Sequence, residues 1–316
     1  MAIRTSRLFV FGCVAASLLP AQPGRVAGPS SGFVFDSSSS ALRRILGVPG
    51  ASVLGDPLQL GFDVASAYIA PGQDYALVVA ADGALHFVRL SAEGASERSV
   101  DGLPGAAEKI AFSPSGTAAA IYAAGRTQFL TGLPDAPVVA GSLLLEDGPS
   151  AMSVSDDGNY LLFAAGGSIR LLGTTGENRK LMDAGEGALV AFASRSHDAA
   201  VSDPAGAGLV LFRDLTGAPR QTIVAAPDDT AASPVGLAFS ADGRKLFLAS
   251  AAARSVAVFD LQSGERGAIA CSCAPASLVS MGNLFRLSEA GPEPLWLFDA
   301  GAAEPRIVFV PAIPAR

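Results

Sequence analysis

One pentapeptide of the sequence has the spacing of a hydrolase nucleophile. Gly28-Pro29-Ser30-Ser31-Gly32 matches Gly-x-Ser-x-Gly, in which a strained turn exposes a serine Oγ for attack on an acyl carbon. That geometry needs a strand before the motif and a helix after it. Here the motif lies in a Pro-, Gly- and Ser-rich stretch, so we interpret residues 22–31 as a linker and do not assign Ser30 as a nucleophile.

The two histidines, His86 and His197, are the next candidates for acid–base or metal chemistry. His86 is placed in an expected strand and His197 in an expected turn. A catalytic zinc site normally takes three protein ligands, and the spacings of dinucleotide, phosphate-loop and His-Glu-x-x-His motifs are absent. We therefore expect no catalytic residue, no metal ligand and no cofactor-binding residue.

Two cysteines stand close together in the sequence Ala-Cys-Ser-Cys-Ala-Pro, at Cys271 and Cys273. In an exported protein an even number of cysteines favours pairing. An extended chain puts residues i and i+2 near the upper Cα–Cα limit for a disulfide, about 6.8 Å, so the segment must bend. We predict a local Cys271–Cys273 disulfide; two buried thiols are the alternative, and a metal pair is less favoured.

The elements that carry these residues follow a repeat. The stretch LAFSADGRKLFLAS (237–250) shares its layout of strand, polar turn and strand with residues 109–124, 151–165 and 189–203, and with looser copies at 67–83 and 277–291. The central apolar residues of the six copies are spaced 38 to 47 residues apart; they are Ile69, Phe112, Val154, Phe192, Phe239 and Val279. Such a period indicates a repeat architecture.

Each copy continues into two further strands. An apolar strand that often ends in Asp follows the hairpin, as in SVAVFDLQSG (255–264), and a weaker strand comes after it. Asp-Gly in Ser-Ala-Asp-Gly (240–243) and Ser-Asp-Asp-Gly (155–158) is typical of hairpin turns, so we interpret Asp156 and Asp157 as turn residues rather than metal ligands. Four antiparallel strands in about 42 residues make one propeller blade.

These blade residues resemble those of the YVTN/lactonase-like and TolB-like bacterial β-propellers. The resemblance covers nearly the whole mature chain and implies an all-β propeller of four-stranded antiparallel blades. Residues 31–60 match only the later half of a unit. We expect seven blades, with six as the alternative, and the ring closed by an N-terminal half blade that RIVFVPA (306–312) completes.

The resemblance also implies where a ligand would bind, on the face made by the loops that enter each blade and follow its second strand. The polar candidates in those loops are Glu108, Asp147, Glu186, Asp228, Asp229 and Arg254. The loops are otherwise rich in Gly, Ala and Pro, and they carry no aromatic residue. The lactonase-type set of polar residues has no residue-by-residue match here.

The N-terminus predicts export. Arg4 and Arg7 precede an apolar run of 12 residues, Leu8 to Leu19, which is too short to span a bilayer and is followed by small residues. We expect residues 1–21 to be a signal peptide, which removes Cys13, and residues 32–313 to form a single propeller domain. The mature protein would be periplasmic or extracellular.

Charge and composition limit the function classes. Without residues 1–21 the chain has 20 basic and 29 acidic side chains, and no basic run exceeds Arg43-Arg44, so nucleic acid is not an expected partner. We expect a monomer without an integral membrane segment. The main hypothesis is a non-enzymatic scaffold for an unidentified protein or small-molecule partner; the alternatives are a lactonase-like hydrolase and a subunit of an envelope assembly.

Overall fold

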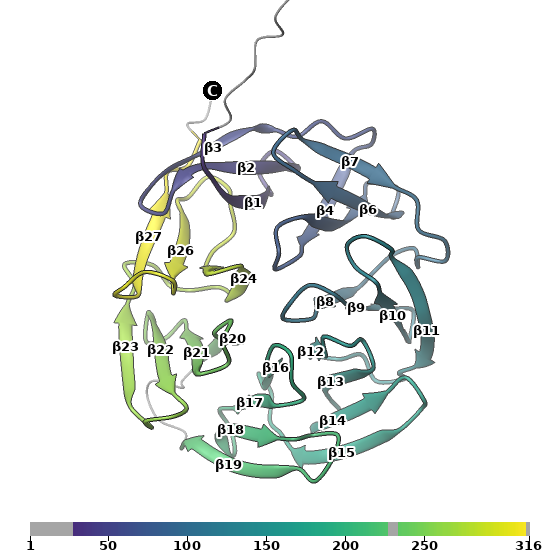
Figure 1. Ribbon diagram of the computed structural model, residues 1–316, viewed down its shortest axis with the longest axis vertical. Coiled ribbons are helices and arrows are strands. Elements are labelled where there is room, and N and C mark those ends of the chain that lie inside the picture. The colour runs from purple at the N-terminus through teal and green to yellow at the C-terminus, as the bar shows by residue number, and fades with distance from the viewer. Residues whose placement is uncertain (1–27, 227–232, 314–316) are drawn as a thin grey trace, which may run out of the picture.

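The protein is a ring of seven antiparallel sheets, which confirms the predicted seven-bladed β-propeller (Figure 1). The structure is a computed structural model that describes residues 28–226 and 233–313. No helix occurs in these ranges, so none of their segments is a helix that could cross a bilayer. The expected signal peptide lies outside the described residues.

Each blade is a sheet of strands that are consecutive in the chain. Blade 1 consists of β1 (Ser30–Asp36), β2 (Ala41–Val48) and β3 (Ala51–Pro57). Blade 2 consists of β4 (Val64–Ile69), β5 (Tyr75–Ala80), β6 (Leu85–Leu90) and β7 (Ala95–Arg98). Blade 3 consists of β8 (Lys109–Phe112), β9 (Ala119–Ala123), β10 (Arg126–Thr131) and β11 (Val138–Leu144). Blade 4 consists of β12 (Ala151–Val154), β13 (Tyr160–Ala165), β14 (Ser168–Gly173) and β15 (Asn178–Asp183). Blade 5 consists of β16 (Leu189–Phe192), β17 (Ala199–Asp203), β18 (Gly208–Arg213) and β19 (Arg220–Ala225).

The last two blades complete the ring. Blade 6 consists of β20 (Pro234–Phe239), β21 (Lys245–Ser250), β22 (Ser255–Asp260) and β23 (Arg266–Ala270). Blade 7 consists of β24 (Val279–Met281), β25 (Leu284–Arg286), β26 (Leu295–Asp299) and β27 (Arg306–Val310). In both Asp-Gly turns the glycine has the left-handed backbone that the sequence predicted, with φ of +70° at Gly158 and +69° at Gly243.

Apolar side chains between neighbouring blades form the core. The second and third strands are buried along most of their length, and a separate cluster fills each blade interface. Between blades 6 and 7, for example, Phe247 packs its ring edge-on against Phe285 and Phe298 at centroid distances of 5.4 and 5.1 Å. Stacked sheets with alternating apolar residues therefore account for the aromatic residues of the repeat.

The predicted closure of the ring by RIVFVPA is wrong. β27 pairs with β26 in blade 7, which has all four of its own strands, so no strand is left to complete blade 1. Blade 1 instead meets blade 7 through packing of Val34 and Ile45 against Leu297 and neighbouring apolar residues. A short parallel bridge joins Asp36 to Ala290, where the Ser37 N–H donates to the Ala290 carbonyl at 3.2 Å.

Blade 1 has three strands rather than the four expected. β3 lies at the rim of the ring and contacts β27, the outermost strand of blade 7, which also contacts β23, the outermost strand of blade 6. The fourth strand position of blade 1 is therefore taken by β3 and the second by β1. No described strand takes the first, innermost position (Figure 1). The Gln73 Oε1 atom accepts the Phe33 N–H there at 2.6 Å. Gly32 has a φ of +129°, a backbone conformation that L side chains rarely adopt, and a Cβ atom there would lie 2.6 Å from the same oxygen; both favour glycine at this position.

The Gly-x-Ser-x-Gly motif is part of this first blade. β1 begins at Ser30, two residues before the expected domain boundary at residue 32, and no helix follows it. The hydroxyls of Ser30 and Ser31 donate to the carbonyls of Ile45 and Gly47 at 3.2 and 2.9 Å. Both hydroxyls therefore stabilise the β1–β2 pairing.

Candidate functional site

Strand direction alternates in each blade, so the loops form two faces. The upper face is the one formed by the loops between successive blades and by the loops between the second and third strands of each four-stranded blade. The remaining turns form the lower face. The described polar candidates are all in upper-face loops: Glu108 before β8, Asp147 before β12, Glu186 before β16 and Arg254 after β21. Asp228 and Asp229 lie outside the described residues.

Two of these candidates bind neighbouring loop backbone. The Glu108 Oε1 atom accepts the Ala124 N–H at 2.8 Å. The Arg254 guanidinium donates to the carbonyls of Ser272 and Cys273, in the loop that joins blade 6 to blade 7, at 2.6 and 3.3 Å. The structure therefore does not gather all the described candidates in one cluster.

Glu186 and Asp147 flank a hollow over blade 4. Its volume is about 240 Å³, and three upper-face loops with the adjoining ends of β13 and β14 form its wall. The lining residues are small apart from Glu186: Gly148, Ser150, Ala164, Ala165, Gly166, Gly167, Ser168, Ala184, Gly185, Glu186 and Gly187. A Cβ atom on Gly166 would lie 3.2 Å from the Asp147 Oδ2 atom, so that carboxylate lies next to a lining residue.

The wall of this hollow is chemically simple. It is largely main chain and small side chains; the one carboxylate among the lining side chains is that of Glu186, and no imidazole or thiol lines the hollow. Pockets for drug-sized ligands usually have 300 to 1,000 Å³. A hollow of this size accepts one side chain of a partner more readily than a large cofactor.

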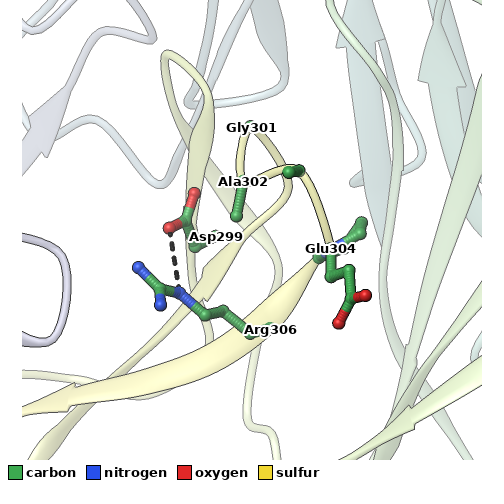
Figure 2. A pocket seen from close by; sticks show the side chains of 7 residues that line it. Asp299, Gly301, Ala302, Glu304 and Arg306 are labelled. Carbon is green, nitrogen blue, oxygen red and sulfur yellow. Dashed lines mark ion pairs between the residues drawn. The ribbon is translucent and has the colours of Figure 1, made fainter.

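A second hollow, of about 640 Å³, lies under the β26–β27 hairpin on the lower face (Figure 2). All its lining residues belong to that hairpin, so no second element closes it. The Arg306 Nε atom pairs with the Asp299 Oδ2 atom at 3.5 Å, and Glu304 points away from this pair (Figure 2). We assign no ligand to this open concavity.

On the lower face, Asp156 ties three blades together. Its Oδ1 atom accepts the Ser115 N–H and hydroxyl from blade 3 at 2.8 and 2.6 Å. Its Oδ2 atom accepts the Arg195 N–H and the Ser194 hydroxyl from blade 5 at 2.7 and 3.2 Å. Burial alone raises the pKa of Asp156, but these hydrogen bonds outweigh it and hold the pKa below its usual value.

Next to this junction, His197 uses both ring nitrogens. Its Nε2 atom lies 3.0 Å from the Asp157 Oδ2 atom, and its Nδ1 atom lies 3.0 Å from the Thr216 Oγ1 atom. Sequence reasoning placed Asp157 and His197 in turns but missed this carboxylate–imidazole–hydroxyl relay. The three residues lie on three different turns, and the only sequence signal was a histidine where other copies have Asp-Gly.

The other histidine, His86, has a simpler environment. Its Nδ1 atom lies 2.7 Å from the Glu97 Oε1 atom on the neighbouring strand, and its ring stacks on Phe62 at 4.0 Å. No group of three or more potential metal ligands occurs within residues 28–226 and 233–313.

Cys271 and Cys273 are bonded through their Sγ atoms in the structure, with a Cα–Cα distance of 5.0 Å. Both residues are buried in the cluster between blades 6 and 7. The Cys271 N–H donates to the Arg254 carbonyl at 2.7 Å, so the bridge fixes the loop that leads into blade 7.

We expect this bond in the protein isolated from an oxidising compartment. Unfolding without a reductant and treatment with iodoacetamide should leave the mass of the mature chain unchanged, because neither sulfur is a free thiol. Reduction before alkylation should add two carbamidomethyl groups. Two groups added without reduction would rule the disulfide out.

Comparison with known proteins shows similarity of fold alone. No family model matches the chain, and no curated protein matches it. A functionally unknown protein from Desulfotomaculum acetoxidans DSM 771 has a crystal structure that superimposes with a TM-score of 0.57 at 13% identity, over 89% of this chain and 100% of that one. KlHsv2 with loop 6CD replaced by a Gly-Ser linker superimposes with a TM-score of 0.54 at 11% identity, over 89% and 97%.

Proposed function

We propose that the protein is an exported β-propeller that acts as a non-enzymatic scaffold and binds a protein partner on its upper face. The observation that carries the proposal is the hollow over blade 4, with its main-chain wall and the two carboxylates at Asp147 and Glu186. Neither carboxylate forms an ion pair within the described ranges. A basic side chain of a partner would complement them.

Export is part of the proposal and rests on the N-terminal sequence. Protein recovered from its native host should begin between Ala21 and Gly24, because a signal peptidase cleaves after the small residues that follow the apolar run. N-terminal sequencing measures this. Recovery of a chain that still begins with Met1 would contradict export through a signal peptide.

A lactonase-like hydrolase at the channel is the competing proposal. A thermal-shift screen with lactones, other small metabolites and divalent metals separates the two, because any ligand of the folded state raises the melting temperature. The scaffold proposal predicts no shift with these compounds. A shift of several degrees with a lactone would favour the hydrolase.

The resemblance to TolB-like propellers supports a third proposal, a subunit of an envelope assembly. This is a narrower form of the scaffold proposal, since it assigns the partner to the cell envelope. Co-purification from a periplasmic extract tests it: a stoichiometric envelope protein would support it, and a monomeric elution without partners would count against it.

A further inference from the structure

The relay of Asp157, His197 and Thr216 has the geometry that activates a hydroxyl. A nucleophile and a base within hydrogen-bond distance, with the base oriented by a third group, are the marks of an activated nucleophile. Here both links measure 3.0 Å. This relay is on the lower face, so the inference goes beyond the proposed scaffold role and does not depend on it.

Asp157 is held as the orienting carboxylate. Its Oδ1 atom accepts the Ser155 hydroxyl and the Asn159 N–H at 2.5 and 3.0 Å, which leaves Oδ2 for His197. Burial raises the pKa of Asp157, but hydrogen bonds from Ser155, Asn159 and His197 lower it overall, so the group stays ionised at neutral pH. An ionised carboxylate only accepts, so the Nε2 atom of a neutral His197 carries the proton. The Nδ1 lone pair then faces the Thr216 hydroxyl.

The turns that carry the relay are joined to each other. The Leu215 N–H donates to the His197 carbonyl at 3.1 Å, and the Asp214 N–H donates to the Asp198 Oδ1 atom at 3.0 Å. The Tyr160 ring meets the His197 imidazole edge-on at a centroid distance of 5.2 Å. These contacts fix the imidazole and the hydroxyl before any reactant arrives.

Solvent reaches the relay. The His197 side chain is 32% exposed, and Thr216 is partly exposed. A small reactant can therefore approach the hydroxyl from the lower face without movement of a strand.

We propose that Thr216 is an activated hydroxyl that accepts an acyl group from an activated ester. The Thr216 Oγ1 atom forms a bond to the acyl carbon while its proton moves to the Nδ1 atom of His197. The bond from the acyl carbon to the leaving oxygen breaks, and the imidazolium, stabilised by Asp157, returns the proton to that oxygen. Acyl-threonine and an alcohol are the products, and no oxidant or metal takes part.

The test uses p-nitrophenyl acetate on the mature protein. Acylation should add one acetyl group, seen in the intact mass, and peptide mapping should place it on Thr216. Thr216→Val should abolish this modification. Thr216→Ser should keep a labelled hydroxyl at the same site, which separates loss of the hydroxyl from disruption of the fold by a substitution there. His197→Gln and Asp157→Asn should slow the labelling at least about tenfold, since general-base assistance contributes about 10² to 10⁴-fold.

His86 offers a matched control, because it also pairs with a carboxylate, but no side-chain hydroxyl from the described part of the chain bonds to its ring. His86→Gln should label at the wild-type rate. Labelling of His197→Gln at the wild-type rate, or acetylation spread over lysines with none on Thr216, would overturn the proposal and leave the relay a structural link between blades 4 and 5. The upper-face binding function would be unaffected by that result.

Discussion

Asp156→Ala should lower the free energy of unfolding by about 3 kcal/mol. The change removes a carboxylate that accepts four hydrogen bonds from blades 3 and 5 and leaves the N–H groups of Ser115 and Arg195 without that partner. Hydrogen bonds to charged groups contribute about 1.5 to 3 kcal/mol each, and water would replace part of this loss on a half-exposed turn. Urea unfolding at neutral pH measures the effect.

Asp242→Ala is the matched control for this prediction. Asp242 occupies the corresponding turn of blade 6. Its carboxylate partners among the described residues all lie within that turn: the Ser240 hydroxyl, the Arg244 N–H and, at 3.9 Å, the Arg244 Nε atom. We expect a loss of about 1 kcal/mol or less. Equal effects of the two substitutions would contradict the role of Asp156 between blades.

The pH dependence provides a second readout. Because the pKa of Asp156 is lowered in the folded state, its contribution is complete above the unfolded value of about 3.9 and is lost as pH falls through the folded pKa. Asp156→Ala should therefore flatten the acid limb of the stability curve. An unchanged acid limb would show that the carboxylate is not ionised in these contacts.

Phe247→Ala should lower the free energy of unfolding by about 3 to 5 kcal/mol, the range for removal of a buried aromatic side chain. Phe247 is 1% exposed and packs against Phe285 and Phe298, which come from the next blade. The cavity would open at the junction of blades 6 and 7, where β24 and β25 are only three residues each. Chemical unfolding with the wild type as reference measures the loss.

Phe247→Leu keeps most of the volume and should cost much less, about 1 to 2 kcal/mol. A similar loss in both variants would mean that the aromatic contacts, rather than the filled volume, stabilise this interface. A loss below 1 kcal/mol for Phe247→Ala would contradict the packing of blade 7 against blade 6.

The repeat made the blades predictable, because each copy carries its own strand pattern and its own turn residues. Phe239 and Val154 are buried as their positions in the pattern require, and Gly158 and Gly243 adopt the turn backbone that Asp-Gly favours. Chain length and period then give seven blades. None of these signals requires knowledge of contacts between distant residues.

The junction between the chain ends was not predictable in the same way. Residues 31–60 match only part of a unit, but the position of the described strands of blade 1 is seen only from contacts between distant residues, such as the packing of Ile45 against blade 7 and the hydrogen bond of Gln73 to Phe33. The prediction that a C-terminal strand completes blade 1 was wrong, because β27 pairs with β26 in blade 7. Apolar packing removes the same exposed surface without an exchanged strand.

Site residues were harder still to predict, because they meet across blades. The loops were expected from the fold, yet of the described candidates only Glu186 and Asp147 flank the hollow. Glu108 and Arg254 form hydrogen bonds with backbone groups of neighbouring loops. The contact of His197 with Asp157 joins residues 40 positions apart, which no local spacing reveals.

Site-specific photo-crosslinking in the native host tests the scaffold proposal most directly. A photoreactive p-benzoylphenylalanine would replace Ser150, an exposed lining residue of the upper hollow, and, in a matched variant, the exposed Asp242 of the lower face, so that Glu186 and Asp147 both remain. We predict one discrete crosslinked product from position 150, reduced by a further Asp147→Lys substitution that repels a basic partner, and no such product from position 242. Absence of a product at position 150, or the same product from both faces, would contradict a partner-binding upper face.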